Sequence, residues 1–169
     1  VFDFGYTIGV LHHTPDPGQG FGNLTKIVKP GGGIACCVYP TNSFYNFPSV
    51  SRYRKIHFVI SKIFGQLTAR YWAVIYSYLS AYLLYDLLRL TRKLSGYGER
   101  VCNYLEYNFI VNLHISDARW RWLDTFDAIT PRYASTHCAN EVRSWYERNN
   151  IGQIKQTAWC DTSFVGIKR

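Results

Sequence analysis

The sequence predicts an α/β protein in which two α/β segments flank a long helical insertion. Residues 1–49 combine an aromatic and β-branched run, a segment with helical spacing and a continuous apolar run. Residues 121–169 end with an amphipathic helix and two short strand-like runs, whereas residues 50–120 are aromatic, basic and helical in pattern. With 169 residues, of which 47% are hydrophobic, the chain is long enough to bury a core.

The first segment predicts a strand, a helix and a second strand. Phe2–Val10 has few charges and is rich in aromatic and branched residues, as strands are. Asp16 and Pro17 suit a helix start, because Asp caps free amides and Pro fits the first helical position. Apolar residues then recur at helical spacing, and Pro30 with the glycines after it is expected to end the helix.

The apolar run from Ile34 to Tyr39 predicts a parallel strand that is covered on both faces. Strand, helix and strand with short connections form a right-handed crossover. Ligands of open α/β sheets bind at the carboxyl ends of the strands. We therefore expect residues 7–13 and the residues after Tyr39 to lie at the binding edge.

The middle segment predicts two helices, from Ile56 to Leu90 and from Glu99 to about His114. Its uncharged part, Tyr71–Tyr85, is shorter than the ~20 apolar residues of a spanning helix. This segment also holds the basic excess: the net charge of +8 divides into zero over residues 1–49, +7 over residues 50–122 and +1 over residues 123–169. The segment therefore has its own role or partner.

Three roles fit these aromatic and basic residues: a cap over an apolar acceptor, a contact of residues 50–95 with an anionic membrane surface, or nucleic-acid binding. Ordinary helix packing also explains the aromatic residues. Of these three roles, nucleic-acid binding is the least favoured and the cap over an acceptor is the most favoured. A non-catalytic helical module on a membrane surface is the alternative function.

The last segment predicts loops at residues 123–127 and 130–133, followed by a helix whose apolar face is Ala139, Val142, Trp145 and Tyr146. A hairpin of residues 151–159 and 163–167 follows. The five cysteines are odd in number and include no CxxC pair, which favours reduced thiols in the cytoplasm over a zinc site or a disulfide framework. No metal site is expected.

Motifs at both ends resemble class I S-adenosylmethionine-dependent methyltransferases. Residues 10–17 (VLHHTPDP) and 28–32 (VKPGG) resemble the fourth strand of that family and the turn before its fifth. Residues 121–133 and 137–145 resemble a more specific pattern of one methyltransferase subgroup. Together these segments cover about half of the chain.

The resemblance implies a partial Rossmann-like methyltransferase sheet with the equivalents of strands 4, 5, 6 and 7. Strands 1 to 3 of the family, with the Gly-rich turn and the ribose-binding acid, have no counterpart here. Because the sequence starts with Val1 and contains no Met, we interpret it as a cut chain whose partner is the missing amino-terminal half. Such a chain leaves its first strand as a bare sheet edge and binds cofactor poorly by itself.

The resemblance also implies roles for individual residues. Residues beside the methionine part of S-adenosylmethionine are Thr7, Ile8, Gly9 and Val10. Candidate bases for a small or lipid-like acceptor are His12 and His13, since imidazole accepts protons near neutral pH. Acceptor contacts are Tyr39, Arg132, Tyr133 and His137. Core packing, loop capping and turn formation are the alternative roles of these residues.

Two further features concern the cofactor site and the last helix. Residues 18–22 read GQGFG, but they do not follow a strand directly, and no Asp or Glu occurs from Pro17 to Tyr85 to bind a ribose. The Thr that caps the family's last helix is replaced by Cys138, while Glu141 is kept. We expect a weakened capping box there, because a thiol accepts hydrogen bonds poorly.

Overall fold

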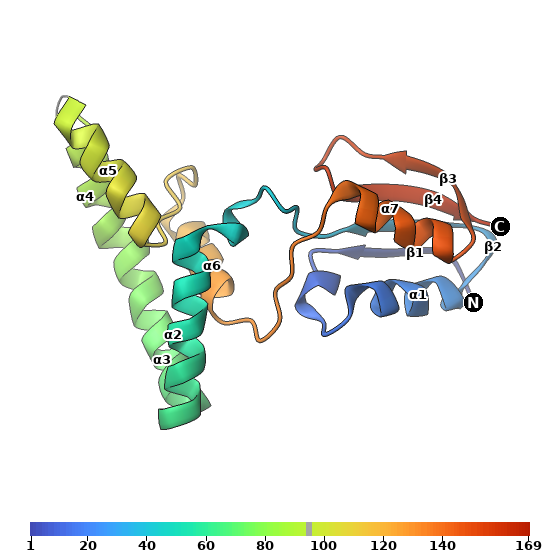
Figure 1. The fold of residues 1–169 in the computed structure, drawn as a ribbon, viewed down its shortest axis with the longest axis horizontal. Helices are drawn as coiled ribbons and strands as arrows, with labels where there is room; N and C mark the ends of the chain where they lie inside the picture. Colours follow the sequence, from blue (N-terminus) through green and yellow to red (C-terminus); the bar gives the residue numbers. More distant parts are fainter. Residues whose placement is uncertain (94–95) are drawn as a thin grey trace. The chain divides into compact units, whose positions relative to one another are not determined.

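The computed structural model describes residues 1–93 and 96–169, which form two compact units. Residues 1–43 and 133–169 make an α/β unit, and residues 44–132 make a helical unit (Figure 1). The two ends of the chain thus share one unit. The helical unit begins before residue 50 and continues beyond residue 120, up to Arg132.

The α/β unit contains a mixed, open, four-stranded sheet of order β1-β2-β4-β3. Strand β1 (Phe2–Ile8) runs parallel to β2 (Val28–Cys37), and helix α1 (Pro17–Ile27) connects them. After the helical unit come α7 (Ala139–Arg148), β3 (Ile151–Gln156) and β4 (Ser163–Lys168). Strand β4 lies between β2 and β3 and is antiparallel to both, so the predicted α/β class and hairpin are confirmed.

The borders of the first elements differ from those expected. Strand β1 ends at Ile8 rather than Val10, because Gly9 has a φ of +69° and turns the chain into a short 3-10 helix, Leu11–His13. Helix α1 ends at Ile27, and Pro30 and its glycines lie inside β2 rather than between the two elements. Strand β2 stops at Cys37, two residues before Tyr39.

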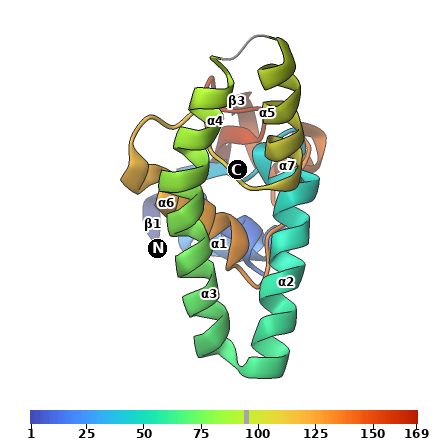
Figure 2. The ribbon, with the colours of Figure 1, turned by 90° about the vertical axis from the view of Figure 1, so that its left-hand side faces the viewer.

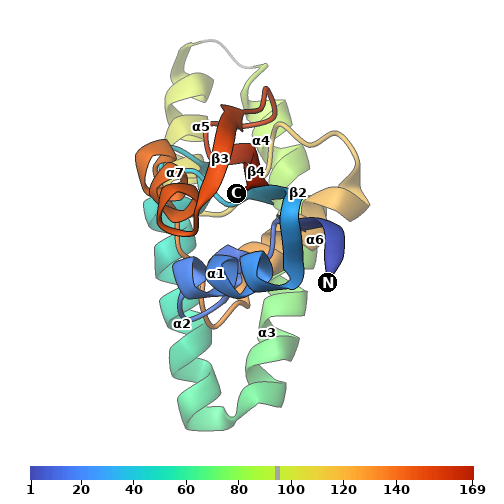
Figure 3. The same ribbon diagram turned by 90° about the vertical axis from the view of Figure 1, so that its right-hand side faces the viewer.

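Helices α1 and α7 lie side by side on one face of the sheet (Figure 3). Their contact is aromatic: the ring centroid of Phe21 is 4.6 Å from that of Tyr146. The Tyr146 hydroxyl donates a 2.6 Å hydrogen bond to the carbonyl oxygen of Phe164, which ties α7 to β4. The core between helices and sheet consists of Leu11, Phe21, Val28, Ile34, Cys36, Val38, Val142, Trp145, Tyr146, Ile151 and Phe164.

Strand β1 is an edge of the sheet, and its side chains alternate between the two faces. Gly5 is buried on the helix-covered side, whereas Phe4 and Tyr6 are 56% and 68% exposed. Such an edge has unpaired backbone groups and can pair with another strand.

The helical unit consists of α2 (Pro48–Phe64), α3 (Gln66–Leu79), a π-helical turn (Ser80–Leu84), α4 (Tyr85–Thr91), α5 (Gly96–Asn108) and α6 (Ala118–Ile129). Figure 2 shows α3 and α4 as one continuous rod, with α2 beside α3 and α5 beside α4. The single helix expected from Ile56 to Leu90 is wrong, because the chain reverses at Gly65. The other expected helix starts and ends earlier, at Gly96 and Asn108.

Residues 123–127, expected to be a loop, belong to helix α6. Asp117 starts this helix, because its Oδ1 accepts hydrogen bonds from the backbone N–H groups of Arg119 and Trp120 at 2.7 and 3.2 Å. None of the described helices combines the length and the apolar composition needed to cross a bilayer.

The turn at Gly65 supports a test of backbone strain. Gly65 has a φ of +88° and a ψ of 161°, a region that residues with a Cβ rarely occupy. Gly65→Ala should therefore lower the free energy of unfolding by about 1–3 kcal/mol, measured by urea denaturation. Gly96→Ala is the control, because an added Cβ meets open space there and the backbone has no positive φ. Equal effects of both substitutions would contradict this account.

The cysteines of the sheet should be inert in the native state. Burial, followed by neighbouring thiols, raises the pKa of Cys36 to about 12, and burial with the Cys160 thiol raises the pKa of Cys37 to about 12. At pH 8 only roughly one such thiol in ten thousand is the reactive thiolate. We expect iodoacetamide to alkylate the exposed Cys138 first, as followed by peptide mass spectrometry. In urea, all of these cysteines should react at similar rates. If Cys36 reacts as fast as Cys138 in the native protein, the expected protection of the sheet cysteines is refuted.

Candidate functional site

The carboxyl ends of β1 and β2 are joined by the segment that returns from the helical unit. The N–H of Ser135 donates to the carbonyl oxygen of His12 at 3.0 Å, and the N–H of His137 donates to that of Tyr39 at 2.8 Å. The N–H of Thr41 in turn donates to the carbonyl oxygen of His137 at 3.0 Å. Residues predicted for the site from three distant parts of the sequence are therefore neighbours at one edge of the sheet.

The two adjacent histidines have different surroundings. His12 is fully buried, and its ring stacks on Tyr39 with 3.6 Å between centroids. Its Nδ1 accepts a 3.3 Å hydrogen bond from the N–H of Tyr39. These contacts make His12 a residue that orients the loop after β2.

His13 is half-buried, and its Nδ1 lies 3.1 Å from the carbonyl oxygen of Tyr133. A carbonyl oxygen only accepts hydrogen bonds, so Nδ1 must carry the hydrogen. In the neutral ring, Nε2 then holds the lone pair and can accept a proton. His13 is therefore better suited than His12 to act as a base.

His137 is buried and links two side chains. Its Nδ1 lies 2.9 Å from Oε1 of Glu141, and its Nε2 lies 2.8 Å from the Ser135 hydroxyl. Serine hydrolases activate their nucleophile through the same order of groups. Here the Ser135 hydroxyl is also 3.3 Å from the carbonyl oxygen of His12, which competes for its hydrogen. We therefore assign these contacts to holding the returning segment in place.

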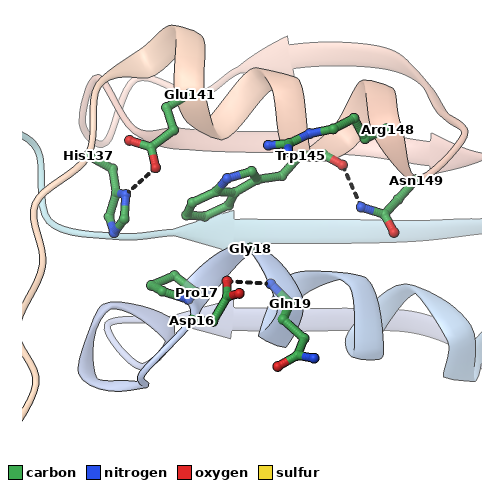
Figure 4. Close-up of a pocket in the computed structure, with 9 residues that line it drawn as sticks. All are labelled: Asp16, Pro17, Gly18, Gln19, His137, Glu141, Trp145, Arg148 and Asn149. Carbon is green, nitrogen blue, oxygen red and sulfur yellow. Dashed lines mark hydrogen bonds and ion pairs between the residues drawn. The ribbon is translucent and has the colours of Figure 1, made fainter.

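His137 separates two cavities. The first has a volume of about 520 Å³ and lies between the start of α1 and helix α7 (Figure 4). Its lining consists of Asp16, Pro17, Gly18, Gln19, His137, Glu141, Trp145, Arg148 and Asn149. The second, of about 290 Å³, is lined by Pro40, Thr41, Asn42, His137, Cys138, Ala139, Gln156, Asp161 and Thr162.

The charged groups of the first cavity take part in local structure. Asp16 caps α1 by accepting the N–H of Gln19 at 2.9 Å, and Arg148 donates from Nε to the carbonyl oxygen of Ser144 at 3.2 Å. Figure 4 shows Glu141 directed at His137, with Trp145 beside them. Two carboxylates at one cavity suit a ligand that donates hydrogen bonds, such as a hydroxyl or an amine.

The predicted cofactor residues form the exposed tip of the edge strand. The N–H of Gly9 donates to the carbonyl oxygen of Cys37 at 3.0 Å, and a Cβ added at Gly9 would have no heavy atom within 4 Å. Ile8 and Val10 are 42% and 57% exposed, and Thr7 is half-buried. The tip thus offers open backbone and apolar surface to a ligand.

Of the most specific part of the family resemblance, residues 121–132 lie in the helical unit and residues 137–145 in the α/β unit. The first of these segments serves the packing of the helical unit. The guanidinium of Arg121 is 3.4 Å from the ring centroid of Tyr85, and its Nε donates to the carbonyl oxygen of Ala81 at 2.9 Å. Asp124 accepts hydrogen bonds from the Tyr45 hydroxyl and the Asn112 amide at 3.0 and 2.7 Å. Arg132 also belongs to the helical unit, whereas Tyr133 belongs to the α/β unit.

The helical unit has a cavity of its own, with a volume of about 380 Å³. It is lined by Tyr78, Tyr82, Arg119, Trp122 and Leu123. Four of these five side chains are aromatic or aliphatic, which suits an apolar ligand.

Sequence reasoning missed the role of Glu141. The weakened capping box expected at Cys138 is confirmed, since Cys138 is an N-cap without a side-chain hydrogen bond, but the contact of Glu141 with His137 was not expected. The spacing of four residues between His137 and Glu141 was the available signal. Among the described residues, no group of three His, Cys, Asp or Glu side chains could hold a metal ion.

Comparisons of this chain with protein-family models, curated proteins and solved structures found no match. The methyltransferase resemblance is therefore carried by the motifs alone.

The contact between His137 and Glu141 can be tested by substitution. Glu141→Ala removes the partner of a buried Nδ1 and should lower the free energy of unfolding by about 1–3 kcal/mol in urea denaturation. Glu141→Gln keeps an acceptor oxygen and should cost less. Glu147→Ala, which breaks an exposed pair with Arg143, should cost less than about 1 kcal/mol. Equal losses for the two alanine variants would argue against the assigned role.

Proposed function

We propose that this chain is the carboxyl-terminal part of an S-adenosylmethionine-dependent methyltransferase that acts on a small or lipid-like acceptor. One observation carries the proposal. Four residues that the resemblance names, His12, His13, Tyr39 and His137, meet at the carboxyl ends of two parallel strands. In open α/β sheets this is the edge where ligands bind.

The sheet order supports the same proposal. In the doubly wound order 3-2-1-4-5-6, the fourth strand lies beside the first at the switch point where ligands bind. Strands β1 and β2 are parallel neighbours connected by α1, as strands four and five are. The other edge of β1 is then the place for strand one, so the proposed partner is the amino-terminal half of the same sheet.

The residues present fit one part of the cofactor. Gly9 and the exposed side chains of Ile8 and Val10 suit the methionine part, which is flexible and partly apolar. The stretch from Pro17 to Tyr85 has no Asp or Glu for the ribose hydroxyls, so we assign that contact to the amino-terminal half. When bound, the cofactor supplies a methyl group on a sulfonium.

The residues of this chain would prepare the acceptor. His13 accepts a proton at Nε2 from an acceptor hydroxyl or amine, while His12 and Tyr39 keep the loop oriented. The proposed acceptor contacts in the same unit are Tyr133, whose carbonyl oxygen is 3.1 Å from Nδ1 of His13, and His137, which is hydrogen-bonded to Tyr39. The odd number of cysteines and the lack of a CxxC pair favour a cytoplasmic location.

The deciding experiment measures cofactor binding by calorimetry, on this chain and on the chain preceded by the residues that its gene encodes upstream. We expect weak binding to the first and clear binding to the second. In the longer chain, Gly9→Ala should weaken binding by roughly tenfold or more. Gly31→Ala is the matched control, since Gly31 also has a positive φ and open space around an added Cβ. Failure of the longer chain to bind the cofactor would remove the proposal.

The base can be tested in the same longer chain. His13→Gln should lower kcat for a hydroxyl or amine acceptor by about 10²- to 10⁴-fold, because the acceptor then keeps its proton. Cofactor affinity should stay unchanged. His114→Gln, at an exposed histidine of the helical unit, is the control and should leave kcat as it is. An unchanged kcat in the His13 variant would assign the proton transfer to another group.

A further inference from the structure

The turn between α2 and α3 lies at one end of the helical unit (Figure 2). Large apolar side chains are exposed there. Ile63, Phe64 and Leu67 are 66%, 66% and 67% exposed. The inner sides of the two helices pack through other residues, among them Tyr53 and Ala73. The three side chains at the turn therefore do not contribute to the core of the unit.

The apolar surface continues from the turn along α3. Leu67, Tyr71, Ile75 and Tyr78 are spaced by four, four and three residues, which places them on one face of the helix. Each of them is more than half exposed. An exposed helix face of this kind marks a contact surface rather than a core.

The helices that carry this surface have basic residues and no acidic residues. Residues 48–79 contain five Arg and Lys and no Asp or Glu. Lys62 and Arg70 are exposed on either side of the turn, and the Lys62 ammonium lies 5.6 Å from the ring centroid of Phe58. Burial first, and then the positive charge of Arg70, lowers the pKa of His57.

We propose that the α2–α3 turn inserts into the surface of an anionic lipid bilayer, with Ile63, Phe64 and Leu67 entering the apolar layer. Lys62 and Arg70 then reach the negatively charged headgroups. Apolar residues next to basic ones, on a helix without acids, have the composition of an interfacial membrane segment. Each basic residue near an anionic surface contributes about fivefold in binding.

The side chains exposed at the turn favour a bilayer over nucleic acid. Single-stranded nucleic acid binds basic grooves through bases stacked on aromatic rings. Two of the three most exposed side chains at the turn, Ile63 and Leu67, are aliphatic and offer no flat face to a base. The proposal does not depend on methyl transfer, so either one can fail without the other.

The test is co-sedimentation of the full chain with phosphatidylcholine vesicles, with and without phosphatidylserine. We expect binding only when phosphatidylserine is present, and weaker binding as salt increases. The double variant Phe64→Ser with Leu67→Ser should bind about tenfold more weakly or worse. Leu90→Ser with Tyr104→Ser is the control, because these side chains are as exposed but lie on α4 and α5.

A second pair of variants separates local from total charge. Lys62→Gln with Arg70→Gln should weaken binding by roughly 25-fold, since two headgroup contacts are lost. Arg89→Gln with Lys93→Gln removes the same charge elsewhere and should have little effect. Circular dichroism confirms that each variant folds.

Three kinds of result would overturn the proposal. One is the lack of a specific effect, seen either as equal binding to neutral and anionic vesicles or as equal losses in the test and control variants. Another is a dimer of the wild-type chain that the Phe64→Ser and Leu67→Ser variant abolishes, because a second copy then covers the turn. The third is displacement of the chain from vesicles by a short oligonucleotide that binds the wild type but not this variant.

Discussion

The α/β unit depends on the pairing of β4 with β2, because this ladder joins two parts of the chain that the whole helical unit separates. It runs from Gly33 opposite Ile167 to Cys37 opposite Ser163. Lys168 adds a second connection, since its ammonium donates to the carbonyl oxygens of Thr25 and Val28 at 2.8 and 2.7 Å. Without the carboxyl-terminal segment, α1 would lose the aromatic partners that complete its core. The unit therefore forms through long-range contacts, which are slow to close.

That ladder also positions the candidate site. Once β4 is paired, the segment of residues 133–137 must pass the carboxyl ends of β1 and β2, where backbone hydrogen bonds bind it. The buried His137 then separates two cavities, and His13 is held by the carbonyl oxygen of Tyr133. The site is thus built by backbone pairing first and by side chains second. This order explains why residues far apart in the sequence share one edge.

Local signals predicted the elements whose ends are set by their own residues. Asp16 and Pro17 start α1 as expected, and the apolar face of Val142, Trp145 and Tyr146 packs into the core. The errors arose where tertiary pairing overrides local preference. Residues 28–33 look like a stop because of Pro30 and its glycines, yet they belong to β2. Val28 and Gly33 pair with Phe2 and Phe4 of β1, and the register shifts between these two pairs. The break at Gly65 was hidden because apolar residues continue on both sides of it.

The position of the candidate residues at one edge of the sheet was predicted, but their individual surroundings were not. The rule for sheet edges located residues 7–13 and the residues after Tyr39, because it needs only strand order. It could not tell a buried His12 from a more accessible His13, since their surroundings come from Tyr39 and Tyr133. Residues 123–127 looked like a loop because partners such as Tyr45, which donates to Asp124, lie far away in sequence. Arg121 binds carbonyl oxygens of the π-helical turn and of the segment before α6.

The bridge between Pro40 and His137 has a consequence for the architecture of the chain. It brings the point where the chain leaves the α/β unit next to the point where it comes back. The contacts among the sheet, α1 and α7 therefore do not depend on the intervening helices. The entropy of closing a loop rises only slowly with its length, so a long insertion at this point is tolerated. Replacing residues 44–132 by a short linker would leave residues 43 and 133 at the spacing they already have. The helical unit is in this sense a separable module that can diverge or be exchanged while the α/β unit is kept.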